Sequence, residues 1–255
     1  MSATTTIEID PANPPVPTDL PFDDGVPMDS PRHRHQMNLL IDSLETRWAG
    51  RKDFYCGGDM FIHFSTERLK NRDFRGPDFF VVLETDHDRD RKYWAVWEEN
   101  GRYPNVIVEL TSPTTEDEDR TTKKAIYERT FSTREYFLYR PDSDVIEGFR
   151  LSGRYKRILP DANGRFWCEE LECWLGTWDG EFLGLSGTWL RFFEKNGDLI
   201  CTGREAEAKR AEAEAKRAET EAKRATNEAK RAEAAEEEVK RLKAEIERLK
   251  SAQGR

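Results

Sequence analysis

Two apolar segments that flank a helical one place the strongest limit on how this chain can fold. Residues 105–110 (NVIVEL) and 134–140 (REYFLYR) have the β-branched and aromatic side chains typical of buried strands. Residues 114–131 between them are predicted as a helix. This connection is long enough for a strand–helix–strand crossover, which is right-handed when its two strands are parallel. The sequence therefore predicts a sheet with a helix packed on it.

The neighbouring segments add a helix and further strands. Apolar residues recur at helical spacing from Met37 to Trp48. Gly57-Gly58 predicts a turn that joins residues 54–64 (FYCGGDMFIHF) into a hairpin. Further strands are expected at 76–84, 93–99, 145–151 and 154–160, with turns at Ser152-Gly153 and 161–164. The order predicts an α+β (mixed α/β) fold with one face of the sheet covered by helix.

The last 52 residues have a different pattern. Lys-Arg pairs recur every seven residues from Lys209 to Arg231, and alanines alternate in steps of three and four. After one three-residue slip, the alternation continues at Val239, Leu242, Ile246 and Leu249. This is the heptad pattern of a coiled coil, so residues 204–255 are predicted as a charged heptad helix that forms a homo-oligomer. Because alanines bury little area, a lone helix stabilised by its charges is the alternative.

Charge differs between the tail and the rest of the chain. From Arg204 onward there are 15 Lys/Arg and 13 Asp/Glu, whereas the preceding 203 residues hold 26 and 37, a net charge of −11. An acidic domain is a poor non-specific phosphate binder, because counterion release needs Lys and Arg. Contacts with DNA phosphates would depend on two local basic clusters, which are otherwise ordinary exposed charges. These are Arg68-Lys70-Arg72-Arg75 and Arg154-Lys156-Arg157.

Cysteine spacing and hydropathy predict a cytoplasmic protein with no membrane span. The four cysteines form no CxxC pair, and the separation of Cys168 and Cys173 fits neither usual zinc spacing, so reduced thiols are expected. No apolar run approaches about 18 residues, and no signal peptide is predicted. Residues 1–31 are rich in Pro, Asp and Thr and are predicted as a disordered lead-in. A folded domain is expected over 32–203.

Three polar residues stand at positions that a purely structural role does not readily explain. Asp78 follows Gly76-Pro77 and opens the apolar strand FFVVL, Glu109 interrupts VIVEL, and Lys123 lies in the following helix. If Asp78 and Glu109 end adjacent strands, their carboxylates converge. Two carboxylates, a main-chain carbonyl and waters suit Mg²⁺. A nearby lysine could orient an attacking water or neutralise charge on a scissile phosphate.

Each of these residues also has an ordinary structural interpretation. Asp78 could form an Asx turn at the start of its strand. Glu109 could lie on an exposed sheet face, paired with an arginine. Asp119 and Lys123 form an i,i+4 pair that could lie on a solvated helix face. Spacing alone does not decide between these alternatives and a metal site.

The order of the motifs resembles the Uma-type family of restriction endonucleases, within the PD-(D/E)XK nuclease superfamily. That family's pattern has Pro-Asp opening one strand, Glu ending another before Ser-Pro, then Asp, Lys and Tyr at helical spacing before an E-Y-W/F strand. The matching positions here are Pro77-Asp78, Glu109, Ser112-Pro113, Asp119, Lys123, Tyr127, Glu135-Tyr136-Phe137 and Pro141. The resemblance spans roughly residues 35–200.

The resemblance implies a PD-(D/E)XK restriction-endonuclease-like core that hydrolyses DNA with Mg²⁺ (or Mn²⁺). Asp78, Glu109 and the Leu110 carbonyl would hold the metal, and Lys123 would position the water. The usual E-x-K motif would place lysine at 111, where this chain has Thr111. A lysine that has migrated to the helix is therefore implied.

Two residues remain as alternatives within this scheme. Lys124 is the alternative to Lys123 as the functional lysine. Glu45, on the first helix, is either an additional acidic ligand or a solvated helix residue. Two other functions stay open: a catalytically silent nuclease fold that acts through its coiled-coil tail, and a nuclease that cleaves RNA.

Overall fold

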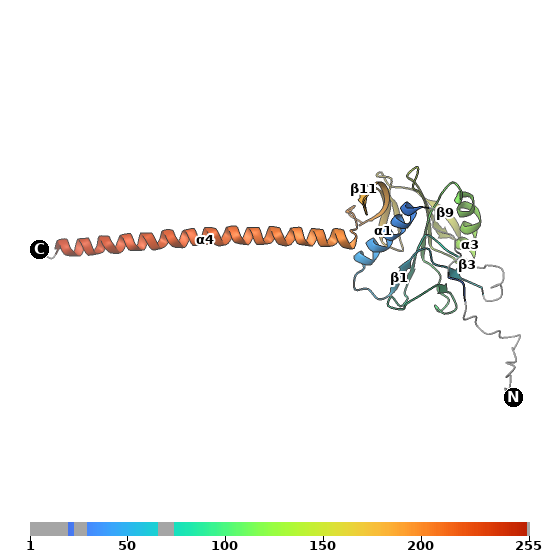
Figure 1. Cartoon of the computed structure of the whole chain (residues 1–255), viewed down its shortest axis with the longest axis horizontal. Coiled ribbons are helices and arrows are strands. Elements are labelled where there is room, and N and C mark those ends of the chain that lie inside the picture. Colours follow the sequence, from blue (N-terminus) through green and yellow to red (C-terminus); the bar gives the residue numbers. More distant parts are fainter. Residues whose placement is uncertain (1–19, 23–29, 66–73, 254–255) are drawn as a thin grey trace, which may run out of the picture. The chain divides into compact units, whose positions relative to one another are not determined.

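A six-stranded sheet organises the first of the two units into which the chain divides, Met1–Thr202 and Gly203–Arg255. The computed structural model describes residues 20–22, 30–65 and 74–253. In spatial order the strands are β1 (Phe54–Gly57), β4 (Phe79–Leu83), β6 (Val106–Leu110), β7 (Glu135–Arg140), β8 (Val145–Ser152) and β9 (Arg154–Ile158). The two edge strands, β1 and β9, are labelled in Figure 1. β6 and β7 are parallel and all other neighbours antiparallel. The predicted crossover is thus a parallel one, and the predicted mixed α+β class is confirmed.

One face of this sheet is covered by helix α1 (Pro31–Arg47) and a second, three-stranded sheet. The second sheet consists of β10 (Phe166–Cys168), β11 (Cys173–Phe182) and β12 (Leu185–Phe193). Leu40 and Leu44 of α1 pack with Val106, Val108 and Leu110 of β6 in one apolar core. The helix begins where the sequence favours it, because Ser30 caps its N-terminus and the first turn of a helix accepts a proline, here Pro31.

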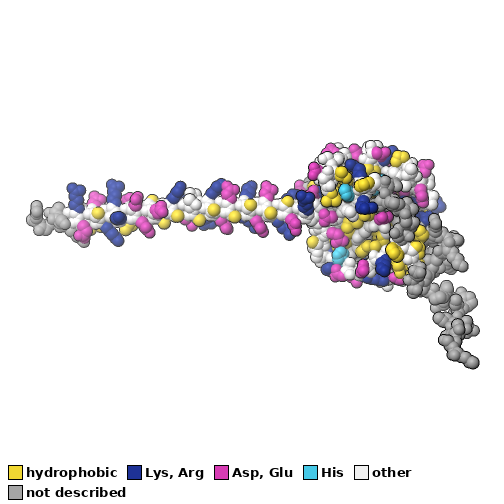
Figure 2. All heavy atoms as spheres, viewed as in Figure 1, with side chains coloured by type: hydrophobic (Ala, Val, Ile, Leu, Met, Phe, Trp, Pro, Cys, Tyr) yellow, Lys and Arg dark blue, Asp and Glu magenta, His cyan; other side chains and the backbone are white. Residues whose placement is uncertain are grey.

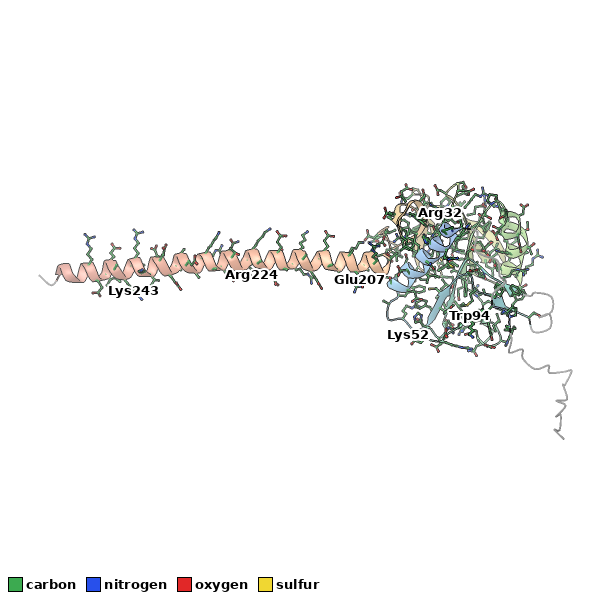
Figure 3. The ribbon with its side chains drawn as sticks, in the orientation of Figure 1. Arg32, Lys52, Trp94, Glu207, Arg224 and Lys243 are labelled. Atoms are coloured by element: carbon green, nitrogen blue, oxygen red, sulfur yellow. The ribbon has the colours of Figure 1, made fainter. Side chains whose placement is uncertain are left out.

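The opposite face carries a short helical segment and a small sheet. The helical segment comprises α2 (Glu116–Glu118), a π-helical turn (Asp119–Lys123) and α3 (Lys124–Arg129), and the small sheet comprises β3 (Phe74–Arg75), β2 (Ile62–His63) and β5 (Trp94–Ala95). Tyr127 of α3 and Trp94, labelled in Figure 3, share a second core with Ile107 of β6. Helices therefore cover both faces, whereas the sequence predicted cover on one.

Two predicted strand arrangements are wrong. Residues 54–64 do not form a hairpin: β1 pairs with β4, and β2 pairs with β3 and β5. Of residues 93–99, only β5 is a strand, and a turn follows it. The predicted hairpin at Ser152-Gly153 is present, as β8 and β9.

Most of the predicted lead-in lies outside the described residues. Leu20–Phe22 are described: Leu20 is buried, and the Pro21 carbonyl accepts a hydrogen bond from His63 Nε2 at 2.8 Å. Pro31 belongs to α1 rather than to a lead-in. Nothing in residues 20–22, 30–65 and 74–253 forms a helix long and apolar enough to cross a membrane.

The second unit is a single helix, α4 (Gly203–Gln253). Lys, Arg and Glu side chains are spread along it (Figure 2), and those of Glu207, Arg224 and Lys243 point away from its axis (Figure 3). The i,i+4 ion pairs Lys223–Glu219 and Arg224–Glu228 support it locally. Val239, Leu242 and Ile246 are each about half exposed, so their apolar surface is available for packing.

Candidate active site

Asp78 and Glu109 lie side by side because β4 and β6 are antiparallel neighbours. Phe79 pairs with Val108, so the residue before β4 faces the end of β6. The Leu110 N–H donates to Asp78 Oδ2 at 2.7 Å, and the Asp78 N–H donates to Glu109 Oε2 at 3.4 Å. The Asp78 carboxylate thus bonds to the neighbouring strand. The Asx-turn alternative is wrong.

Close packing of the loop after β1 fixes the position of the Pro77-Asp78 turn. The Asp59 N–H donates to the Pro77 carbonyl at 3.0 Å. A Cβ atom at Gly58 would lie 2.0 Å from the Asp78 carbonyl oxygen and 2.7 Å from the Met37 side chain. Only glycine fits there. The Gly57-Gly58 pair therefore serves a close approach to the site rather than the predicted hairpin turn.

Lys123 reaches the carboxylates from the helical segment that packs on the same face of the sheet as the Glu109 side chain. Its Nζ lies 3.2 Å from Glu109 Oε2 and 2.8 Å from Asp119 Oδ1. Tyr127 donates its hydroxyl to Glu109 Oε1 at 2.8 Å, so both oxygens of this fully buried carboxylate have partners. The exposed-face alternative for Glu109 and the solvated-face alternative for Lys123 are wrong, since Lys123 is only 17% exposed.

A π-helical turn carries Lys123, and the side chains of Lys123 and Lys124 point to different places. Tyr136 donates its hydroxyl to the Asp119 carbonyl at 2.9 Å, which anchors the start of the turn to β7. Lys124 Nζ instead lies 3.4 Å from the centre of the Phe149 ring. Single π turns inside helices frequently occur at functional sites. Of the two candidate lysines, the structure therefore brings only Lys123 to the carboxylates.

The site holds more negative charge than its own cation balances. Burial raises the pKa of Glu109 to about 7, helped by the neighbouring Asp78 charge and opposed by Lys123. Burial likewise raises the pKa of Asp78 to about 6 and shifts the pKa of Asp119 upward. Burial lowers the pKa of Lys123, but the three carboxylates outweigh it and raise that pKa. Three acids facing one lysine leave room for an additional positive charge.

The oxygen donors present fit a hard divalent cation. Asp78 and Glu109 supply carboxylate oxygens, and the adjacent Leu110 supplies a main-chain carbonyl, the ligand types that Mg²⁺ prefers. In the part of the chain that the structure describes, no three His, Cys, Asp or Glu side chains form a ready metal site. A cation here would therefore keep several waters, as Mg²⁺ usually does.

Glu45 and those residues of the basic clusters that the structure describes do not join this site. Glu45 accepts a hydrogen bond from Cys56 Sγ at 3.2 Å and lies 3.6 Å from His87 Nε2. Arg68, Lys70 and Arg72 lie outside the described residues. Arg75 donates to the Phe74 carbonyl. In the second cluster Arg154 and Lys156 are exposed, and Arg157 pairs with Glu147.

One contact to the site was not foreseen from the sequence. His33 of α1 lies with Nε2 3.0 Å from the Leu110 carbonyl oxygen. The available signal was the segment Pro31-Arg-His-Arg-His35, which places ring nitrogens directly after a helix cap. Nothing local indicated that this turn would reach the end of β6.

The family model that matches this chain agrees with the motif order. Residues 23–173, more than half of the chain, match the Uma2 family model, described as "Putative restriction endonuclease". A solved structure of a "putative nuclease belonging to DUF820" from Anabaena variabilis is similar, with a TM-score of 0.41 and 13% identity, over 57% of this chain and 76% of that one. No curated protein matches.

Proposed function

The chain belongs to the Uma2 family, and on this basis we propose that it is a metal-dependent endonuclease that hydrolyses DNA phosphodiester bonds. We assign residues 32–203 to a PD-(D/E)XK nuclease core and residues 204–255 to assembly. The observation that carries the proposal is the convergence of Asp78, Glu109 and Lys123 in one largely buried cluster; they come from the residue before β4, from β6 and from a π turn. All four cysteines are free thiols, which fits work in the cytoplasm.

In this proposal Asp78, Glu109 and the Leu110 carbonyl hold Mg²⁺ or Mn²⁺. When bound, the cation supplies Lewis-acid stabilisation of the charge that develops on the phosphate. Tyr127 donates to Glu109 Oε1 and leaves Oε2 directed at Lys123 and the Asp78 main chain. The second carboxylate is oriented by the Leu110 N–H. Such fixed hydrogen bonds keep both carboxylates in place before substrate arrives.

Lys123 has the geometry to hold the attacking water. Its charge is secured by Asp119 on the same turn, and it lies 3.2 Å from Glu109, beside the carboxylates that hold the cation. An ammonium donates up to three hydrogen bonds, so one can orient a water for in-line attack while two bind carboxylates. The same positive charge stabilises the phosphate as negative charge builds on it.

A cleavage assay on duplex DNA, single-stranded DNA and RNA tests the proposal. We expect nicks in duplex DNA that require Mg²⁺ or Mn²⁺ and disappear in Asp78→Asn and Glu109→Ala. Cleavage confined to RNA would show that the substrate is RNA rather than DNA. Absence of cleavage together with absence of Mn²⁺ binding would refute the enzyme, and would favour a silent fold that acts through its tail.

The tail is proposed to assemble the protein as a homo-oligomer. The half-exposed side chains of Val239, Leu242 and Ile246 recur at heptad spacing, and pairing two such helices would bury them. We expect the full chain to sediment as an oligomer and a chain truncated after Thr202 as a monomer. Val239→Glu with Leu242→Glu should give the monomer in the full chain. An unchanged number of chains per particle after truncation would refute assembly through the tail.

A further inference from the structure

Both main-chain polar groups of Leu110 are held by side chains from elsewhere in the chain. The N–H donates to Asp78 Oδ2, and the carbonyl oxygen lies 3.0 Å from His33 Nε2. Because a carbonyl can only accept, Nε2 must carry the hydrogen. Nδ1 lies 3.4 Å from the hydroxyl of Ser30, the residue that caps α1. The imidazole is thus fixed between the helix cap and the end of β6.

We infer that His33 is a positioning residue for the proposed metal site, acting through the Leu110 carbonyl. The inference rests on the proposed function, because it concerns the main-chain oxygen assigned there as a ligand. A carbonyl oxygen has two lone pairs, so it can accept from His33 and still bind a cation. Partners one step removed from a metal orient its ligands and tune their affinity.

Attachment of α1 to the domain does not need this hydrogen bond. Gln36 already forms two with β12, from Nε2 to the Leu190 carbonyl at 2.8 Å and from the Leu190 N–H to Oε1 at 2.9 Å. Leu40 and Leu44 of the same helix are fully buried in the core. The ring of His33, by contrast, is only partly buried. Its defined contribution is the orientation of one peptide group beside Glu109.

Mn²⁺ binding to the full-length protein, measured by calorimetry and electron paramagnetic resonance at one fixed pH, tests this role. His33→Ala should weaken Mn²⁺ binding by about 10–100-fold, the usual loss when such a partner is removed. His33→Gln should restore most of it, since its side-chain amide can still donate to the carbonyl. The matched control is His87→Ala, because His87 Nδ1 lies 3.3 Å from the Phe54 carbonyl, another main-chain oxygen. It should bind as the wild type does.

The outcomes separate this inference from the function on which it rests. Unchanged or tighter Mn²⁺ binding in His33→Ala, with normal binding in the wild type, overturns the role of His33 alone. An equal loss in His33→Gln and His33→Ala also overturns it, because a retained donor would then have no effect. Failure of the wild type to bind Mn²⁺ overturns both proposals.

Discussion

Replacing Lys123 with alanine should lower the rate of metal-dependent DNA cleavage by about 10²–10³-fold, the range for removing one preorganised electrostatic donor. The lysine is the cation beside Glu109 and Asp119, at 3.2 Å and 2.8 Å, and burial strengthens its effect on nearby charge. Single-turnover cleavage at saturating Mg²⁺ measures the chemical step directly. Survival of full cleavage in Lys123→Ala would remove the lysine from the mechanism.

Lys124→Ala is the matched control for this experiment. The two lysines are adjacent, yet Lys124 packs over Phe149 and does not reach the carboxylates. Its replacement should leave the rate unchanged. Removing Lys123 also leaves buried carboxylates unpaired, which can cost about 3–5 kcal/mol of folding stability. Circular dichroism at the assay temperature therefore has to show that Lys123→Ala is folded before its rate is interpreted.

The pairing of Asp78 with Glu109 was accessible from the sequence because strand alternation is a local property. The alternation of VIVEL assigns Glu109 to the face of Ile107, and the two cores confirm that assignment. Pro77-Asp78 marks the start of the next apolar strand. A helix between two strong strands predicts a crossover, and β6 and β7 are parallel. These features depend on periodicity and connection length alone.

The failed hairpin shows where local signals mislead. Gly57-Gly58 has the composition of a tight turn, but β1 pairs with β4, more than twenty residues later in the chain. Gly58 is needed because the Asp78 carbonyl would lie 2.0 Å from any Cβ there. A glycine that is required by close packing against a distant segment looks the same in the sequence as a glycine that forms a turn.

The contacts that surround the carboxylates were likewise hidden because they depend on tertiary packing. Nothing in the spacing of Asp119 and Lys123 distinguishes a π turn from a regular helix, and this turn sends Lys123 rather than Lys124 into the site. The contact of His33 with Leu110 joins residues 77 positions apart. The sequence could name the acids and offer two lysines. Choosing between the lysines required the fold.

Glu109→Gln should stabilise the metal-free protein at about pH 8 while abolishing its response to Mn²⁺. Burial raises the pKa of Glu109 from 4.5 to about 7 in the folded protein. Between these values the folded state binds more protons than the unfolded state, so the free energy of unfolding falls as pH rises. The loss is on the order of 3 kcal/mol, complete once the pH exceeds about 7.

Glutamine matches the shape of Glu109 and carries no charge, so the variant lacks this loss. Tyr127 can still donate to the side-chain oxygen, and Lys123 keeps Asp119 as its partner. The amide nitrogen of glutamine then faces two other donors, Lys123 Nζ and the Asp78 N–H, which offsets part of the gain. Thermal unfolding without metal should therefore give a Tm several degrees above wild type at about pH 8 and a much smaller difference at about pH 5. Added Mn²⁺ should raise the Tm of the wild type only. A residue kept for function lowers stability until its ligand binds, so its replacement should raise the Tm. A lower Tm in Glu109→Gln at the higher pH would instead indicate that this glutamate is a structural ion-pair partner of Lys123.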